Sequence, residues 1–231
     1  MRFIKKVLSF IFLIIFIVTA VLTALGYGKY KQAIGLLPIG EAAKNIRSDD
    51  SFTPIEDISP TFKNAMVAVE DRRFYKHKGI DVVGIGRAIK TNIEKRSLSE
   101  GGSCITQQLA KNIYFMHDTS INRKIAEVMI ALSLEKEFSK EEILELYFNV
   151  IYYGSGYYNI ADACKGYFGK TPSTITDYEA TLLAGIPNAP SVYSLDNNPD
   201  LAKKRQKTVI KAMVDMKYMT KEWAQELMDM N

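Results

Sequence analysis

The feature that most constrains this 231-residue chain is an uncharged apolar stretch near its N-terminus. The stretch is VLSFIFLIIFIVTAVLTALGYG, residues 7–28. At about 1.5 Å per residue, a helix of this length spans the roughly 30 Å hydrocarbon core of a bilayer. Three basic residues lie among residues 1–6, so the positive-inside rule predicts a cytoplasmic N-terminus. We therefore expect a single transmembrane helix at 7–28 and an extracytoplasmic remainder.

A cleaved secretory signal is the alternative interpretation of this stretch. The apolar run is longer than the usual signal core of about 7–15 residues, and no A-x-A cleavage site follows it. These two observations favour a retained anchor. Under both interpretations, the rest of the chain functions on the far side of the membrane.

Composition predicts one domain after the membrane segment. With 47% hydrophobic and 24% charged residues, the chain can bury one sizeable core. We place that domain at 52–231 and interpret the poorly periodic segment 29–51 as a membrane-proximal connection. The net charge of +4 suits an anionic membrane surface or a phosphate-bearing ligand. No surface of interleaved basic and aromatic residues indicates nucleic-acid binding.

The two cysteines indicate neither a disulfide scaffold nor a zinc site. Cys104 and Cys164 form no CxxC pair and no Cys/His cluster at metal spacing. We expect both thiols to be free.

Helix signals dominate the region after residue 52. Capping residues followed by apolar residues at helical spacing predict helices that begin after Ser59, Asp81 and Ser103. Later helices are expected at about 122–138, after the capping boxes SKEE (139–142) and TDYE (176–179), at 199–216 and at 220–230. The segment EKRSLSEGGS, 94–103, is predicted to be a polar loop. No segment shows sustained strand alternation, so the predicted fold is mainly α.

Three polar clusters are candidate functional segments. They are EDRRFYKHKGID (70–81), GGSCITQQLAKN (101–112) and RKIAE (123–127). Separately, each has an ordinary explanation as a solvated helix end, a turn or an exposed ion-pair surface. The chain contains no Walker loop, HExxH, GxGxxG or GxSxG motif, which excludes the commonest nucleotide, zinc-protease and serine-hydrolase readings.

Together, the clusters resemble the motifs of peptidoglycan glycosyltransferases of family 51, found also in class A penicillin-binding proteins. The first matches EDxxFxxHxGxD, the second matches GGSTITQQxxKN, and the third continues into RKxxExxxAxxLExxxSKxEILExYxN. The similarity extends through YFGK (167–170) and LLAGIPNAPSVY (182–193). Because the chain ends soon afterwards, it looks like a monofunctional transglycosylase rather than a bifunctional penicillin-binding protein.

The resemblance implies a fold and a reaction. The family has a lysozyme-like helical domain with a smaller membrane-proximal lobe. Its members polymerise lipid II by transferring the growing glycan onto the 4-hydroxyl of an incoming unit. The link is β-1,4, formed with inversion, and undecaprenyl diphosphate is released. The implied partners are lipid II, the nascent glycan strand, the bacterial plasma membrane and other cell-wall synthesis proteins, with no nucleic acid.

The resemblance also assigns roles to individual residues. Glu70 matches the catalytic base, and Glu127 matches the second glutamate of the family. Residues at the motif positions that bind the donor and its diphosphate are Arg87, Ser103, Gln107, Gln108, Lys111 and Arg123. Arginine and lysine suit this task because they donate several charge-assisted hydrogen bonds to phosphate oxygens. No cofactor is obligatory, and a divalent cation, Mg²⁺ or Mn²⁺, stays open without assigned ligands.

The chain departs from the family pattern at two places. Cys104 stands where threonine is usual in GGSTITQQ, which removes a hydroxyl beside the donor site. The segment GSGYYNIADACKGYFGK (154–170) also differs from the usual glycine- and alanine-rich pattern, at Asn159, Asp162, Cys164 and Lys165. The catalytic motifs themselves are intact.

Two rival functions remain at this stage. A lysozyme-like fold could instead cleave peptidoglycan glycan, although neutral glycan gives no reason for Arg87, Lys111 and Arg123 to converge. The chain could also be an inactive membrane-anchored scaffold that binds the cell wall, for which both glutamates would be unnecessary.

Overall fold

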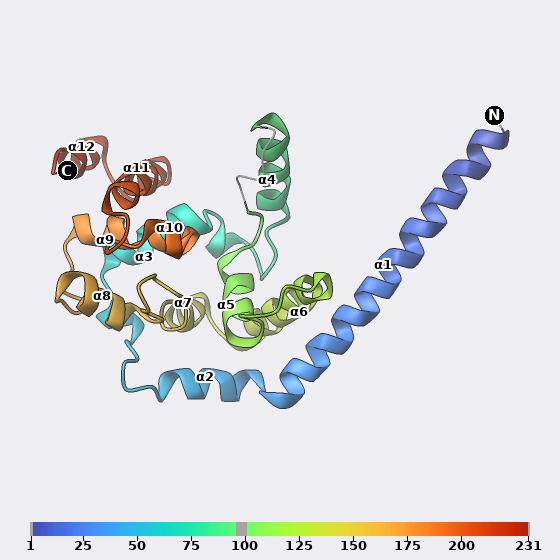
Figure 1. Cartoon of the computed structure of the whole chain (residues 1–231), viewed down its shortest axis with the longest axis horizontal. Coiled ribbons are helices and arrows are strands. Elements are labelled where there is room, and N and C mark those ends of the chain that lie inside the picture. The colour runs from blue at the N-terminus through green and yellow to red at the C-terminus, as the bar shows by residue number, and fades with distance from the viewer. Residues whose placement is uncertain (1, 96–100, 231) are drawn as a thin grey trace.

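The computed structural model describes residues 2–95 and 101–230, and these ranges contain helices and no strand. The α-helices are α1 (Arg2–Leu36), α2 (Ile39–Arg47), α3 (Pro60–Glu70), α4 (Val82–Lys95), α5 (Ile105–Tyr114), α6 (Ile121–Glu137), α7 (Lys140–Phe148), α8 (Ile160–Phe168), α9 (Asp177–Leu183), α10 (Pro190–Tyr193), α11 (Pro199–Asp215) and α12 (Lys221–Asp229). Short 3₁₀ turns are η1 (Ile55–Asp57), η2 (Phe74–Lys76) and η3 (Ile186–Asn188). The predicted mainly-α fold is confirmed (Figure 1). The predicted polar loop lies partly outside the described residues, at 96–100.

The capping signals in the sequence mark real helix starts. Ser59 accepts a hydrogen bond from the Phe62 amide at the start of α3. Both predicted capping boxes are present: Ser139 with Glu142 begins α7, and Thr176 with Glu179 begins α9. Each cap satisfies backbone N–H groups that the helix itself leaves unpaired.

The predicted cap of α5 is wrong. Helix α5 begins after Cys104, and Ser103 does not cap it, because the Ser103 hydroxyl accepts a hydrogen bond from Lys124 instead. The amide of Ile105 donates to the carboxylate of Asp71, at 3.1 Å. A side chain from the residue after α3 therefore caps α5, which local sequence patterns cannot reveal.

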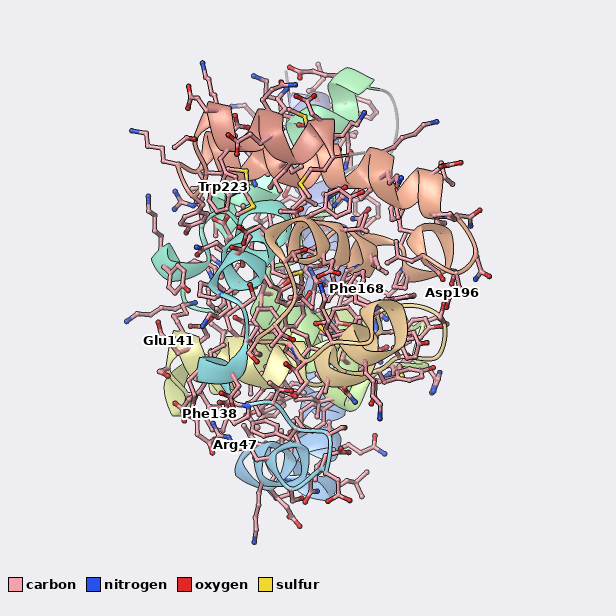
Figure 2. All side chains as sticks on the ribbon, turned by 90° about the vertical axis from the view of Figure 1, so that its left-hand side faces the viewer. Arg47, Phe138, Glu141, Phe168, Asp196 and Trp223 are labelled. Atoms are coloured by element: carbon pink, nitrogen blue, oxygen red, sulfur yellow. The ribbon has the colours of Figure 1, made fainter. Side chains whose placement is uncertain are left out.

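The segment 29–51, interpreted as a connection, is largely helical. Helix α1 continues to Leu36, and α2 follows it along the lower edge of the body (Figure 1). Helix α2 buries small alanines and is held by Arg47, which forms ion pairs with Glu142 and Glu145 of α7. The Arg47 guanidinium also lies over the Phe138 ring, at 5.9 Å from its centroid, and Figure 2 shows the two side chains together. These tertiary contacts hold α2 against α7 and the start of the domain core.

Helix α3 belongs to the buried core. It packs against α9 and α11, and Phe62, Ala65 and Met66 are fully buried. Burying a side chain as large as Phe62 or Met66 contributes about 1.5–3 kcal/mol. The Phe62 ring meets the Phe148 ring edge-on, with centroids 5.1 Å apart, which joins α3 to α7. Because Glu70 is the last residue of α3, the core fixes the position of its backbone.

Helix α4 stands away from the body (Figure 1). Its apolar residues occur at helical spacing, as the sequence predicts, but Val82, Val83, Ile89 and Ile93 are exposed. None of these four side chains belongs to the described hydrophobic core, whereas Ile85 is partly buried and lies near Gly102.

Helix α1 has an exposed N-terminal part and a packed C-terminal part. Its residues Phe3–Leu36 are long and apolar enough to cross a bilayer, and most of them are exposed. The C-terminal part of α1 lies beside α6 (Figure 1). Lys29 binds Asp118 and Ser120 before α6, and Gly26 is buried against Ile125.

We predict opposite effects on stability for two glycine substitutions in α1. A Cβ at Gly26 would lie 2.5 Å from the Ile125 Cβ, whereas a Cβ at Gly28 would meet nothing within 4 Å. Gly28→Ala should stabilise the protein by up to about 1 kcal/mol, because alanine favours helix. Gly26→Ala should destabilise it by about 1–3 kcal/mol, because overpacking forces α1 away from α6. Denaturant unfolding in detergent measures both, and equal shifts would contradict the packing of α1 on α6.

Candidate active site

A cavity of about 930 Å³ opens between the end of α3, the facing sides of α4, α5 and α6, and α11. Seven of the eight residues predicted from the motifs line it. They are Glu70, Arg87, Ser103, Gln107, Gln108, Lys111 and Glu127. The eighth, Arg123, does not line the cavity and instead contacts Glu127 from within α6.

One carboxylate oxygen of Glu70 accepts a hydrogen bond, and the other has no hydrogen-bond partner. Its side chain is 8% exposed, and its Oε2 accepts a hydrogen bond from the Gln108 amide at 2.9 Å. Its Oε1 is buried without a hydrogen-bond partner. An unpaired buried carboxylate oxygen is costly, and such groups are often reserved for a ligand or a reaction.

A second hydrogen bond fixes the orientation of Gln108. The hydroxyl of Tyr147 donates to Gln108 Oε1 at 2.9 Å, which turns the amide nitrogen toward Glu70. Burial raises the pKa of Tyr147 well above its usual value, so this hydroxyl stays protonated and donates. The side chains from α7, α5 and α3 therefore form one oriented chain of donors that ends on the carboxylate.

Burial raises the pKa of Glu70 above its ordinary value, because a charged carboxylate is poorly solvated there. The Gln108 hydrogen bond and the positive charge of Arg205 oppose this rise, and the neighbouring Asp71 carboxylate adds to it. A carboxylate with a raised pKa is a better proton acceptor, which is the property that a general base requires.

Asp71 connects the end of α3 to the start of α5. Its buried carboxylate accepts from the Ile105 amide at 3.1 Å and contacts His77 Nε2 at 2.8 Å. His77 lies in the loop that ends at Gly79, where φ is +83° and an added Cβ would lie 3.0 Å from the Ala131 backbone. Asp71, His77 and Gly79 of the EDxxFxxHxG pattern therefore hold the surrounding segments in position around Glu70.

Gln107 also has a supporting position. It is buried, and its amide donates to the Gly79 carbonyl oxygen at 3.2 Å, as does the Cys104 thiol. Burial raises the pKa of Cys104 to about 11, so its thiol stays protonated and is a poor nucleophile at neutral pH. Both cysteines are free, as predicted.

Glu127 lies deep in the cavity wall with two cations. Its side chain is 1% exposed, and its Oε2 accepts from Lys124 at 2.9 Å. Arg123 Nε lies 3.1 Å from its Oε1 without hydrogen-bond geometry. Lys124 also donates to Ser103 at 2.6 Å, which joins the RKIAE and GGSCITQQ segments.

The described lining of the cavity carries more positive than negative side chains. Its lysines and arginines are Arg72, Arg87, Lys111, Lys124 and Arg205, whereas its carboxylates are Glu70 and Glu127. The motif comparison did not select Arg72, Lys124 or Arg205. Lys124 and Arg72 lie inside recognised motifs, but nothing in the sequence pointed to Arg205, which reaches the cavity from α11.

The described side chains do not suit Mg²⁺ or Mn²⁺. These ions favour sets of oxygen ligands, but Glu127 is already engaged by Arg123 and Lys124. The mixed His, Cys and carboxylate cluster found among the described residues is Asp71, His77 and Cys104. These residues do not line the cavity, and their ligand atoms bond to one another or to the backbone.

Comparison with known proteins decides the family. The sequence model described as "Transglycosylase" matches residues 39–214, which is more than half of the chain and begins at the first residue of α2. The chain belongs to the transglycosylase family. The residues matched by the family model include every element that lines the cavity.

Relatives of this transglycosylase chain include penicillin-binding proteins. It is 45% identical to penicillin-binding protein 1A of Neisseria gonorrhoeae over 169 residues, covering 73% of this chain and 21% of that protein. It is 39% identical to penicillin-binding protein 1F of Bacillus subtilis, covering 94% of this chain and 33% of that protein. The chain therefore spans a fifth to a third of their length. The crystal structure of penicillin-binding protein 1A from Haemophilus influenzae aligns with a TM-score of 0.39 and 30% identity over 55% of this chain and 16% of that one.

We predict that Asp71→Ala strongly destabilises this transglycosylase. The substitution leaves the buried Ile105 amide and the His77 ring without an acceptor, and each unpaired donor costs about 1–3 kcal/mol. The matched control is Asp57→Ala, because Asp57 is exposed and should change stability by less than about 0.5 kcal/mol. Urea unfolding measures both variants. A loss at Asp71 no larger than at Asp57 would contradict the proposed link between α3 and α5.

Proposed function

We propose that this chain is a peptidoglycan glycosyltransferase that polymerises lipid II into β-1,4-linked glycan strands. The observation that carries the proposal is a carboxylate, Glu70, with one oxygen fixed and one free, at the wall of a cavity rich in cations. The family membership supports the same activity.

The proposed reaction transfers a proton to Glu70 and the glycan to the acceptor hydroxyl. Glu70 takes the proton of the acceptor 4-hydroxyl as that oxygen attacks the anomeric carbon of the donor. The bond from the anomeric carbon to the diphosphate oxygen breaks on the opposite face, which inverts the configuration. The electron pair leaves on undecaprenyl diphosphate, and the proton stays on Glu70 until solvent removes it.

The leaving diphosphate needs positive charge that is already in place. Arg87 and Lys111 line the cavity, and no ion pair to another described residue occupies them. They are free to donate charge-assisted hydrogen bonds to phosphate oxygens. Glu127 acts on the same group indirectly, because it holds Lys124 at the cavity wall beside Ser103. Arg123 lies beside Glu127 and does not line the cavity, so we assign it a supporting role.

The membrane helix fits a substrate whose lipid tail stays in the bilayer. We place residues 1–6 in the cytoplasm, 7–28 across the plasma membrane and the cavity outside. Anchoring keeps enzyme and lipid II at the same surface and raises their effective concentration. The packing of the end of α1 on α6 supports a retained helix, because cleavage would expose that face of α6.

Cleavage of peptidoglycan is the second candidate. A buried carboxyl group with a raised pKa is also what a glycan hydrolase needs for its general acid. Hydrolysis of neutral glycan, however, gives no reason for Arg87 and Lys111, which form no ion pair with another described residue, to line the cavity. An inactive scaffold gives no reason for Tyr147 and Gln108 to form an oriented series of hydrogen bonds to Glu70.

The direct test incubates the purified full chain in detergent with labelled lipid II. We expect labelled glycan polymer and released undecaprenyl diphosphate. Glu70→Gln should lower the rate by roughly 10²–10⁴-fold, the usual cost of losing a general base. The control, Glu56→Gln, changes an exposed glutamate outside the cavity and should leave the rate unchanged.

Two results would contradict the proposal. Shortening of preformed glycan without polymerisation of lipid II would favour the hydrolase. Near-normal polymerisation by folded Glu70→Gln would remove Glu70 from the role of base. Circular dichroism checks that each variant is folded.

A further inference from the structure

We infer that Arg205 is a positioning residue that keeps the free oxygen of Glu70 anionic and aimed at the acceptor hydroxyl. The inference rests on the proposed function and extends it to a residue that the three polar sequence clusters do not include. Arg205 lies on α11, which packs against α3. Its Nη2 is 3.9 Å from Glu70 Oε1, and the two side chains are 16% and 8% exposed.

The separation between the two groups suits a base. At 3.9 Å, the guanidinium is near enough to stabilise the negative charge but too far to form a hydrogen bond with Oε1. The lone pairs of Oε1 therefore stay available, whereas Oε2 is occupied by Gln108. Because only Oε1 has lone pairs available, we predict that Oε1 takes the proton.

Arg205 also has a hydrogen-bond donor without a partner. Its Nε is buried and makes no hydrogen bond to a described residue. Glu70 Oε1 and Arg205 Nε are thus an acceptor and a donor left unpaired in the same wall of the cavity. A hydroxyl group can donate one hydrogen bond and accept another, so an acceptor hydroxyl between them would satisfy both atoms.

Gly185 makes room for the stem of Arg205. A Cβ at Gly185 would lie 2.9 Å from Arg205 Cγ, so any side chain there would displace the arginine. Gly185 follows α9, which also packs on α3 and α11. The stem of Arg205 is therefore confined by the same core that fixes Glu70.

The other groups that face Glu70 cannot replace Arg205. Asp71, the next residue in the chain, carries a like charge and disfavours the ionised form of Glu70. Tyr147 of α7 stays neutral and reaches Glu70 only through Gln108 of α5. Lys111 of α5 lines the same cavity, but Arg205 is the cation that forms an ion pair with Glu70 among the described residues.

The test measures how kcat/KM for lipid II polymerisation depends on pH in Arg205→Met, Arg205→Lys and the wild type. Removing the charge should raise the pKa of Glu70 further, so the acidic limb of the Arg205→Met profile should move to higher pH. Its rate should fall most at low pH and recover toward alkaline pH. Arg205→Lys keeps the charge and should keep the limb close to that of the wild type.

Lys204→Met is the matched control, because it removes one exposed charge from the neighbouring position of α11. Its profile should equal that of the wild type. A lower rate of Arg205→Met at every pH, with an unmoved acidic limb, would overturn the inference. A wild type that makes no polymer would instead contradict the proposed function.

A second variant covers the case in which Arg205→Met does not fold. Gly185→Ala retains the arginine but pushes its stem, and it should move the acidic limb in the same direction by a smaller amount. A folded Gly185→Ala protein with an unmoved limb would also overturn the inference.

Discussion

The hydrogen bond from the Ile105 amide to the Asp71 carboxylate determines the geometry of the cavity. It fixes where α5 begins relative to the end of α3. Gln108 lies one turn further along α5, and Glu70 immediately precedes Asp71. Together with the packing of α5 on α6 and α7, this bond brings Gln108 within hydrogen-bond distance of Glu70. A buried acceptor that serves both a helix N-terminus and His77 cannot be removed without unpairing two donors.

The electrostatics of the site balance burial against charge. Burial and the nearby Asp71 favour the neutral form of Glu70, whereas Gln108 and Arg205 favour the ionised form. A base must lose its proton before the reaction and accept one during it, so neither influence can dominate. Arg87 and Lys111 also line the cavity. In the proposed reaction they have a different role, which is to stabilise the negative charge of the leaving diphosphate.

The sequence predicts those parts of the fold that depend on local chemistry. Helix starts at Ser59, Ser139 and Thr176 follow from residues that bond their own helix, and each is confirmed. The family motifs likewise predict seven residues of the cavity lining, which lie on or next to α3, α4, α5 and α6.

Features that depend on contacts between distant segments could not be predicted in this way. The cap of α5 comes from Asp71, α2 is stabilised by ion pairs with α7, and Arg205 reaches Glu70 only after α11 packs on α3. The exposed apolar side chains of α4 are a similar case. The spacing of apolar residues predicts the helix, but it does not predict whether those side chains are buried.

The central claim is that Glu70 functions as a base whose pKa is raised by burial. The most direct measurement is the pH dependence of kcat/KM for polymerisation of lipid II by the wild type. The account predicts that the rate falls on acidification, with the acidic limb above the ordinary pKa of glutamate, because protonated Glu70 cannot take the acceptor proton. A rate that stays constant down to the ordinary glutamate pKa would contradict it.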